Sequence, residues 1–264
     1  MPHVRLDDVS LYYEWHGPDS APVLVVNNGL LMTTASWGPQ LADFSRAHGL
    51  LLYDLRQQGA SDHPAAPTSM DQHADDLARL LDALGVTAAH VLGLSYGGEV
   101  AQAFALAHPR RVRSLVLADT VSEVGPELRA VVEGWRAAAA AGDAAAFYAT
   151  TLPWNFSPGF IAAHTALLTT ARRRYDALDF PAVVRLGDAF LGVDFTDRLS
   201  RVTAPACVVV GELDHLKGRS YAERLAAALP RSELHLVAGA GHAASWERPA
   251  EFNSVVLGFL AKQD

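Results

Sequence analysis

The sequence predicts an α/β fold, in which a mostly parallel, doubly wound sheet is interrupted by an inserted helical segment. Short apolar runs alternate with longer helical patterns along most of the chain. Several of these runs are apolar throughout, which is typical of strands that helices cover on both faces of a sheet. One stretch near the middle carries helical patterns only. The alternation of strand and helix implies right-handed crossovers between parallel strands.

Strands are expected at residues 11–15, 23–26, 50–53, 90–94, 115–118, 207–210 and 234–237. Helices are expected at residues 37–46, 70–84, 96–108, 219–229 and 249–261. In the middle stretch the helical patterns cover residues 127–141, 143–150, 158–175 and 181–192. We therefore expect residues 1–119 and 200–264 to form one core, and residues 120–199 to form a helical cap inserted into it.

The composition restricts both the fold and the partners. Half of the 264 residues are hydrophobic and 19% are charged, so the chain can bury a sizeable core. The formal net charge of -8 excludes the basic field that a nucleic-acid binder needs. The single cysteine, Cys207, excludes an internal disulfide and is interpreted as a packing residue of a buried strand.

No segment has the pattern of a targeting or membrane sequence. Residues 1–10 are partly charged and lack the apolar core of a signal peptide. No window reaches the roughly 18 consecutive apolar residues that a spanning helix needs. We therefore expect a cytoplasmic protein without a membrane partner, either a monomer or a small homo-oligomer.

The first chemical signal is the sequence Gly93-Leu94-Ser95-Tyr96-Gly97, which follows a predicted strand and opens a predicted helix. A serine on such a sharp turn has strained backbone dihedrals and an exposed hydroxyl. The residues two positions away on either side must be small so that strand and helix can approach each other. The motif alone is weak, but this context makes Ser95 the predicted nucleophile.

A serine hydroxyl needs a base, and the base needs an acid that orients it. His242 lies in a glycine-flanked loop just past a predicted strand and is the candidate base. Asp214 directly follows the strand at residues 207–210 and is the favoured acid, while Asp119 also follows a strand and is the rival. All of these positions are expected at the same edge of the sheet.

Acyl transfer also requires backbone donors that stabilise the developing oxyanion. The turn Asn27-Asn28-Gly29-Leu30 follows a predicted strand and can present the amide of Leu30. The second predicted donor of this oxyanion hole is the amide of Tyr96, directly after the nucleophile.

The order of serine, acid and histidine on this strand and helix pattern resembles the α/β-hydrolase superfamily across nearly all of the chain. Three further stretches resemble family motifs: residues 54–61, residues 107–112 and the ending that begins at Gly241 and His242. The resemblance implies an α/β-hydrolase fold with a catalytic triad of Ser95, Asp214 and His242. It implies no cofactor and no metal, because the triad supplies nucleophile and base itself.

Two positions depart from the family pattern, and one loop is similar to a particular branch. Asn28 stands where many members have a histidine, and Gln57 replaces the expected first glycine of the loop after the fourth strand. Residues 28–37 are similar to the hydroxyacyl-transferring branch that makes rhamnolipid precursors from acyl-thioesters.

The helical cap offers apolar side chains for a substrate pocket between cap and sheet. We expect the pocket to be lined by Trp135, Tyr148, Leu152, Trp154 and Phe156. Such a lining favours an uncharged ester of modest size. The adjacent Arg172, Arg173 and Arg174 could meet a phosphate-bearing carrier, but three neighbouring arginines spread around a helix and are interpreted as solvated surface.

These observations predict a carboxylesterase-like serine hydrolase that acts on a small-molecule ester, lactone or thioester with a small to medium apolar acyl group. A serine nucleophile argues against the epoxide hydrolases and haloalkane dehalogenases of the same fold. Four alternatives remain open: an acyltransferase that uses an acyl-thioester donor, a carbon–carbon bond hydrolase, a cofactor-free haloperoxidase and a non-enzymatic receptor. The acyl length, the stereochemical preference and the physiological substrate are left open.

Overall fold

The structure, a computed structural model, describes residues 2–263. In this range eight strands form one sheet in the order β1-β2-β4-β3-β5-β6-β7-β8. The pairs β1–β2 and β2–β4 are antiparallel, and the other five pairs are parallel, which confirms the predicted mostly parallel α/β fold. The strands are β1 (His3–Arg5), β2 (Ser10–His16), β3 (Val23–Asn27), β4 (Gly49–Tyr53), β5 (Ala89–Leu94), β6 (Val112–Ala118), β7 (Ala206–Gly211) and β8 (Ser232–Val237).

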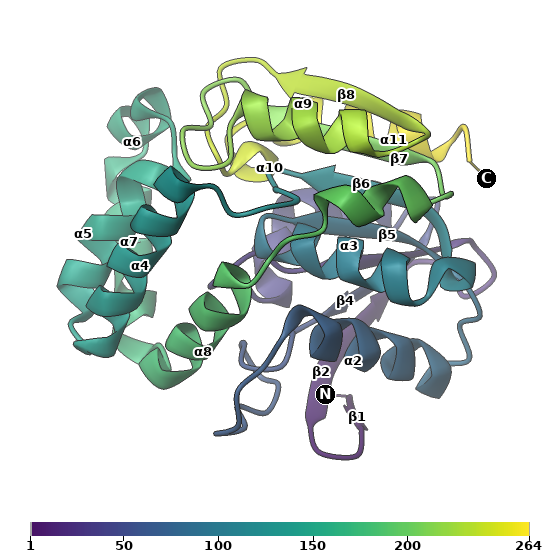
Figure 1. Cartoon of the computed structure of the whole chain (residues 1–264), viewed down its shortest axis with the longest axis horizontal. Coiled ribbons are helices and arrows are strands. Elements are labelled where there is room, and N and C mark those ends of the chain that lie inside the picture. The colour runs from purple at the N-terminus through teal and green to yellow at the C-terminus, as the bar shows by residue number, and fades with distance from the viewer. Residues whose placement is uncertain (1, 264) are drawn as a thin grey trace.

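Helices cover both faces of the sheet (Figure 1). One face packs against α2 (Met70–Ala83), α3 (Tyr96–Ala107) and α9 (Arg219–Ala228). The other face packs against α1 (Gly38–Phe44) and α11 (Pro249–Leu260). Short helical turns complete the layers: η1 (Thr34–Trp37), η2 (Pro109–Arg111) and α10 (Ala244–Glu247).

Alternate residues of the central strands enter two separate hydrophobic cores. In β3, Val25 packs with the cluster beneath α2 and α3, whereas Leu24 and Val26 pack with the cluster beneath α1 and α11. Successive side chains of a strand point to opposite faces of the sheet. Because both faces of the sheet are buried, the residues of such a strand form a continuous apolar run. The strand can therefore be recognised in the sequence.

The helices that connect β6 to β7 lie together beside one end of the sheet (Figure 1). We call residues 120–199 the cap, and their status as a separate domain stays a prediction. The cap contains α4 (Pro126–Ala140), α5 (Ala144–Asn155), α6 (Pro158–Ala163), α7 (Thr165–Arg172), η3 (Arg173–Ala177) and α8 (Phe180–Leu191). The turn η4 (Thr196–Arg201) begins in the cap and ends in the core.

Three local expectations were wrong in detail. The helix expected at residues 158–175 is divided into α6, α7 and η3, with His164 between the first two in a non-helical conformation. The helix expected at residues 37–46 begins as the turn η1 and ends at Phe44. The sequence pattern also missed β1, whose three residues are mostly exposed and pair with β2 only at the edge of the sheet.

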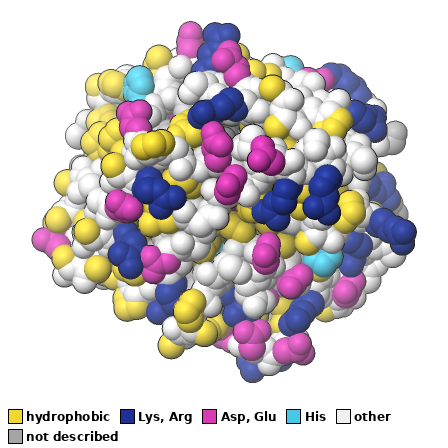
Figure 2. Space-filling model, viewed as in Figure 1, with side chains coloured by type: hydrophobic (Ala, Val, Ile, Leu, Met, Phe, Trp, Pro, Cys, Tyr) yellow, Lys and Arg dark blue, Asp and Glu magenta, His cyan; other side chains and the backbone are white. Residues whose placement is uncertain are grey.

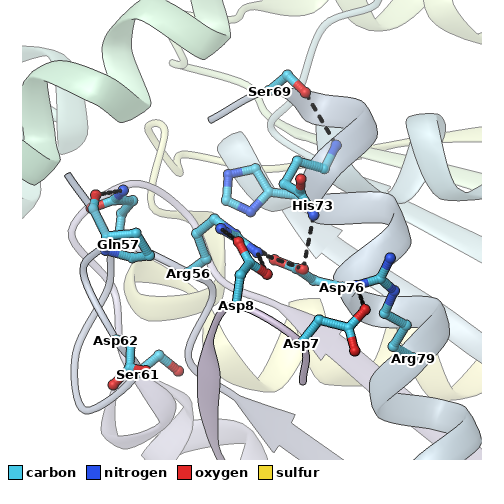
Figure 3. A network of polar contacts seen from close by, with 12 residues as sticks. Asp7, Asp8, Arg56, Gln57, Ser61, Asp62, Ser69, His73, Asp76 and Arg79 are labelled. Atoms are coloured by element: carbon cyan, nitrogen blue, oxygen red, sulfur yellow. Dashed lines mark hydrogen bonds and ion pairs between the residues drawn. The ribbon is translucent and has the colours of Figure 1, made fainter. Parts of the chain in front are cut away.

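Arg56 fixes the loop that follows β4. Its guanidinium is buried between Asp76 of α2, 2.7 Å from Nε, and Asp8 of the turn between β1 and β2, 2.8 Å from Nη1 (Figure 3). A guanidinium can bind two carboxylates because it presents five donors in a planar fork. This contact joins three segments that are distant in sequence and holds the loop in place.

The surface carries charges of both signs. Figure 2 shows basic and acidic side chains interspersed on the face that carries α3 and α9. Within residues 2–263, no helix combines the length and the apolar character that crossing a membrane requires.

Candidate active site

Ser95 occupies a strained turn between β5 and α3. Its backbone φ of +51° lies in the left-handed region that side chains rarely adopt. A Cβ on Gly93 would lie 2.1 Å from the Gly97 carbonyl oxygen, and a Cβ on Gly97 would lie 2.1 Å from the Asn27 carbonyl oxygen. Only glycine fits at either position. The turn therefore presents the Ser95 side chain at the end of the strand.

The three residues of the predicted triad form one hydrogen-bonded line. His242 Nε2 lies 2.8 Å from Ser95 Oγ, and His242 Nδ1 lies 2.9 Å from Asp214 Oδ2. Ser95, Asp214 and His242 follow β5, β7 and β8, so the parallel sheet brings them to one edge although 147 residues separate Ser95 from His242. His242 and Asp214 are buried.

Backbone amides hold Asp214 in its charged form. Its Oδ1 accepts hydrogen bonds from the amides of Leu216 at 2.8 Å and Lys217 at 2.9 Å. Burial alone raises the pKa of this carboxyl, but the His242 imidazole and the two amides outweigh it, and the pKa of Asp214 is lowered. Asp214 is therefore an anion beside the imidazole.

Asp119, the rival acid, is also buried at this edge of the sheet but contacts a different partner. Its Oδ1 accepts a hydrogen bond of 2.8 Å from the Gly211 amide, and no hydrogen bond to His242 is formed within the described residues. Burial and the neighbouring Asp214 charge raise the pKa of Asp119 well above its usual value. The pKa values of the two carboxyls thus shift in opposite directions, and the imidazole is hydrogen-bonded to the one whose pKa is lowered.

The two predicted oxyanion donors flank Ser95. Leu30 lines the same cavity as Ser95, and Tyr96 is the first residue of α3. The first amides of a helix have no acceptor within the helix, so the Tyr96 amide is free for a ligand. The Leu30 amide likewise has no acceptor among the described residues.

Asn28 anchors the loop that carries Leu30. Its Nδ2 donates to the Tyr53 carbonyl oxygen at 3.0 Å and to Asp54 Oδ1 at 3.3 Å. Its Oδ1 accepts a hydrogen bond of 2.8 Å from Trp37 Nε1. The loop is therefore tied to β4 and to η1 through the asparagine that replaces the family's histidine.

His73 contacts the residue after the nucleophile, a contact that the sequence did not reveal. His73 Nε2 lies 2.9 Å from Tyr96 Oη, and the two rings meet edge to face. Burial, with a smaller contribution from the Arg56 charge, lowers the pKa of His73 to about 3. A neutral His73 on α2 thus fixes the Tyr96 side chain on α3 (Figure 3 shows His73 and Arg56).

Gln57 is the second residue that departs from the family pattern, and it has a positive φ and contacts the cap. Its φ of +73° is the conformation for which the family uses glycine. Its side chain donates to the Pro64 carbonyl oxygen at 2.6 Å and accepts from Arg185 Nη2 at 3.0 Å. Since Arg185 lies on α8, Gln57 joins the loop after β4 to the cap.

A cavity of about 280 Å³ opens at Ser95 and His242 between sheet and cap. Of the predicted pocket residues, Trp135, Tyr148 and Phe156 line it. The prediction was wrong for Leu152 and Trp154, which lie outside it; Trp154 packs against the hydrophobic core instead, and Leu152 is half-buried elsewhere on α5. The prediction also missed lining residues, including Leu31, Met32, Leu167, Leu178 and Trp246.

Arg174 is exposed, as the interpretation as solvated surface expected, but it also lines this cavity, which was not expected. Its position could have been found from helical spacing, because Leu167, Thr170, Ala171 and Leu178 of the same segment also line the cavity and recur every three or four residues. Arg172 and Arg173 are absent from that face.

One group of potential metal ligands lies near the start of β7, at the opposite end from Asp214. The ligand atoms of Cys207, Glu233 and His235 lie within 4.8 Å of one another. Burial raises the pKa of the Cys207 thiol to about 12, and Glu233 is paired with Lys262 at 3.1 Å. Because a protonated thiol and a neutralised carboxylate bind metals poorly, this group is interpreted as packing.

Comparison with known proteins places the chain in a family. The model of the α/β-hydrolase fold family matches residues 22–249. RutD of Azorhizobium caulinodans, a proposed carbamate hydrolase, is 31% identical over 267 residues, which is 100% of each chain. The crystal structure of MGS-M2, an α/β-hydrolase enzyme from a Medee basin deep-sea metagenome, superposes with a TM-score of 0.93 at 29% identity, covering 98% of this chain and 97% of that one.

A third similar protein is an enol-lactonase from Burkholderia xenovorans. Its crystal structure superposes with a TM-score of 0.92 at 26% identity and covers 98% of this chain and 100% of that one. The similarity therefore extends over nearly all of the chain, sheet and cap included. Since the family model alone spans far more than half of the sequence, the chain belongs to the α/β-hydrolase family.

Proposed function

We propose that this chain is a serine hydrolase that cleaves carboxylic esters, including lactones and thioesters, through an acyl-serine intermediate. The observation that carries the proposal is the hydrogen-bonded line from Asp214 through His242 to Ser95, which ends in an apolar cavity. The names of two similar proteins, a carbamate hydrolase and an enol-lactonase, both describe transfer of an acyl group to water and support this class of reaction.

The reaction begins when Ser95 Oγ attacks the carbonyl carbon while His242 Nε2 accepts the hydroxyl proton. The carbonyl oxygen takes the electron pair of the C=O π bond, and the amides of Leu30 and Tyr96 stabilise its charge. Collapse breaks the bond to the alcohol, which leaves with the proton from His242. Water then attacks the acyl group with His242 again as base, and the acid and free Ser95 are released.

Asp214 orients His242 and stabilises the imidazolium that forms during each attack. Its lowered pKa keeps it charged, which this role requires. The pKa of Asp119 is raised, and within the described residues it forms no hydrogen bond with His242. The proposal therefore assigns the triad to Ser95, His242 and Asp214, and gives Asp119 a structural role through its hydrogen bond to the Gly211 amide.

The cavity supports a substrate of modest size. Its volume of about 280 Å³ is near the lower end of the range for small-molecule pockets, and most of its lining is apolar. An acyl group of small to medium length fits such a space. The acyltransferase remains the second candidate, because residues 28–37 resemble a hydroxyacyl-transferring branch and this loop carries the Leu30 donor.

A panel of nitrophenyl esters of increasing acyl length, with the matching nitrophenyl carbamates, tests the proposal. We expect hydrolysis of esters with short to medium acyl chains and slower hydrolysis of the carbamates. Absence of turnover on every ester contradicts ester hydrolysis, and faster turnover of carbamates reassigns the substrate. Acyl transfer to an added alcohol or hydroxyacid that exceeds hydrolysis favours the acyltransferase.

A further inference from the structure

Arg174 is the one side chain of permanent charge in the wall of the cavity that contains Ser95, within the described residues. It belongs to η3, the turn that continues α7. No aspartate or glutamate among residues 2–263 lines the same cavity. The remaining lining is formed by aliphatic and aromatic side chains with a few neutral polar ones.

The fold separates Arg174 from its two neighbouring arginines. Arg172 is neutralised by Asp176, whose carboxylate oxygens lie 2.7 and 2.8 Å from its Nη1. Arg173 is exposed and does not line the cavity. Arg174 follows Leu167 by seven residues, which is two helical turns, and therefore shares its face of the segment. Arg174 is exposed as well, but this spacing places it on the side of the segment that lines the cavity.

Arg174 has no hydrogen bond or ion pair with any described residue. Two other arginines of the cap are paired with carboxylates: Arg172 with Asp176, and Arg136 with Asp188. Arg174 is exposed, so its guanidinium is accessible to an anion that enters the cavity from solvent. Its planar fork matches the two oxygens of a carboxylate.

We propose that Arg174 binds a carboxylate at the far end of the substrate's acyl group. The preferred substrates are then half-esters or lactones derived from dicarboxylic acids, with the scissile carbonyl at Ser95 and the free carboxylate at the side of the cavity formed by η3. This assignment rests on the proposed acyl chemistry at Ser95. It replaces the uncharged substrate that the apolar cap residues alone suggested.

The test compares mono-methyl adipate with methyl heptanoate, a neutral ester of similar shape. We expect wild-type protein to favour the half-ester in kcat/KM, and Arg174→Gln to lower the ratio of the two values about tenfold, the effect of one charge-assisted hydrogen-bonding pair. The loss should fall mainly on KM. Arg173→Gln, which removes the adjacent exposed arginine, should leave the ratio unchanged. Added salt should narrow the wild-type ratio, because it screens the contact.

The other outcomes contradict either the carboxylate site at Arg174 or the proposed hydrolysis at Ser95. An equal loss on both esters in Arg174→Gln means that Arg174 acts through shape and binds no carboxylate. If Arg174→Gln lowers kcat/KM only for a coenzyme A thioester assayed in parallel, Arg174 binds a phosphate of that substrate and not a carboxylate. If neither ester is hydrolysed, the proposed function fails, and calorimetric titration of adipate into Ser95→Ala protein still tests the site: Arg174→Gln in that background must weaken adipate binding, and unchanged binding overturns the inference.

Discussion

Lys217 Nζ lies 2.9 Å from Glu99 Oε1, and the side chains of this ion pair are only 4% and 0% exposed. Glu99 lies on α3, four residues after Ser95, and Lys217 follows Asp214 by three residues. The pair therefore joins the helix that begins after the nucleophile to the loop that holds the proposed acid. The ammonium also lies 4.4 Å from the centre of the Phe190 ring on α8, so the cap contacts the same group.

Lys217→Met should lower the free energy of unfolding by about 3–5 kcal/mol, because it leaves the buried Glu99 carboxylate without a positive charge beside it. Glu99→Gln combined with Lys217→Met should recover most of this loss, since both charges are then absent. Chemical denaturation of the single and double variants measures the difference. A double variant that is as unstable as the sum of the two single variants would show that the charges do not interact.

Asp214→Asn should reduce kcat by about a thousandfold to ten-thousandfold, because the imidazole loses its charged partner and its correct tautomer. Asp119→Asn should reduce kcat far less, since Asp119 accepts a hydrogen bond from the Gly211 amide and His242 is hydrogen-bonded to Asp214 instead. Steady-state kinetics on one nitrophenyl ester compares the two variants. The reverse order of effects would assign Asp119 to the triad.

His73→Gln should change how stability depends on pH. The folded protein keeps His73 neutral down to about pH 3, whereas the unfolded chain protonates it below about pH 6.5. Between these values the unfolded state binds one more proton, so His73 makes stability fall as the pH falls. In His73→Gln the slope of unfolding free energy against pH should be smaller by about 1.4 kcal/mol per pH unit in this window. Identical slopes would show that His73 is protonated in the folded protein.

Gln57→Ala should destabilise the protein more than Gln57→Gly does. Both variants lose the hydrogen bonds to the Pro64 carbonyl and Arg185, but only glycine adopts the positive φ of this position without strain. The two variants should differ by about 1 kcal/mol in unfolding free energy. Thermal and chemical unfolding measure this difference. Equal stability of the two variants would mean that the loop adjusts its backbone.

The sequence pattern was sufficient for every strand of the described sheet except β1, and for the residues at the edge of the sheet, for a physical reason. Parallel strands buried on both faces are uniformly apolar, and Ser95, Asp214 and His242 each follow one of them. Side chains that follow the carboxyl ends of neighbouring parallel strands meet at one edge, whatever their separation in the chain.

Contacts that depend on packing between distant helices were not predictable in the same way. The pairing of His73 with Tyr96 requires α2 to lie beside α3, which no local pattern specifies. Trp154 was expected in the pocket because it is aromatic, but the burial of α5 against the core places it elsewhere. Arg174 is exposed, as its charge suggested, but its helical spacing from Leu167 also places it in the wall of the cavity.

The central claim is that Ser95 becomes acylated during turnover, and a fluorophosphonate probe tests it most directly. Intact-mass spectrometry should show one probe per chain, peptide mapping should locate it on Ser95, and Ser95→Ala should remain unlabelled and inactive while its unfolding curve matches that of the wild type. Labelling at another residue, or ester hydrolysis by Ser95→Ala at the wild-type rate, would contradict the account.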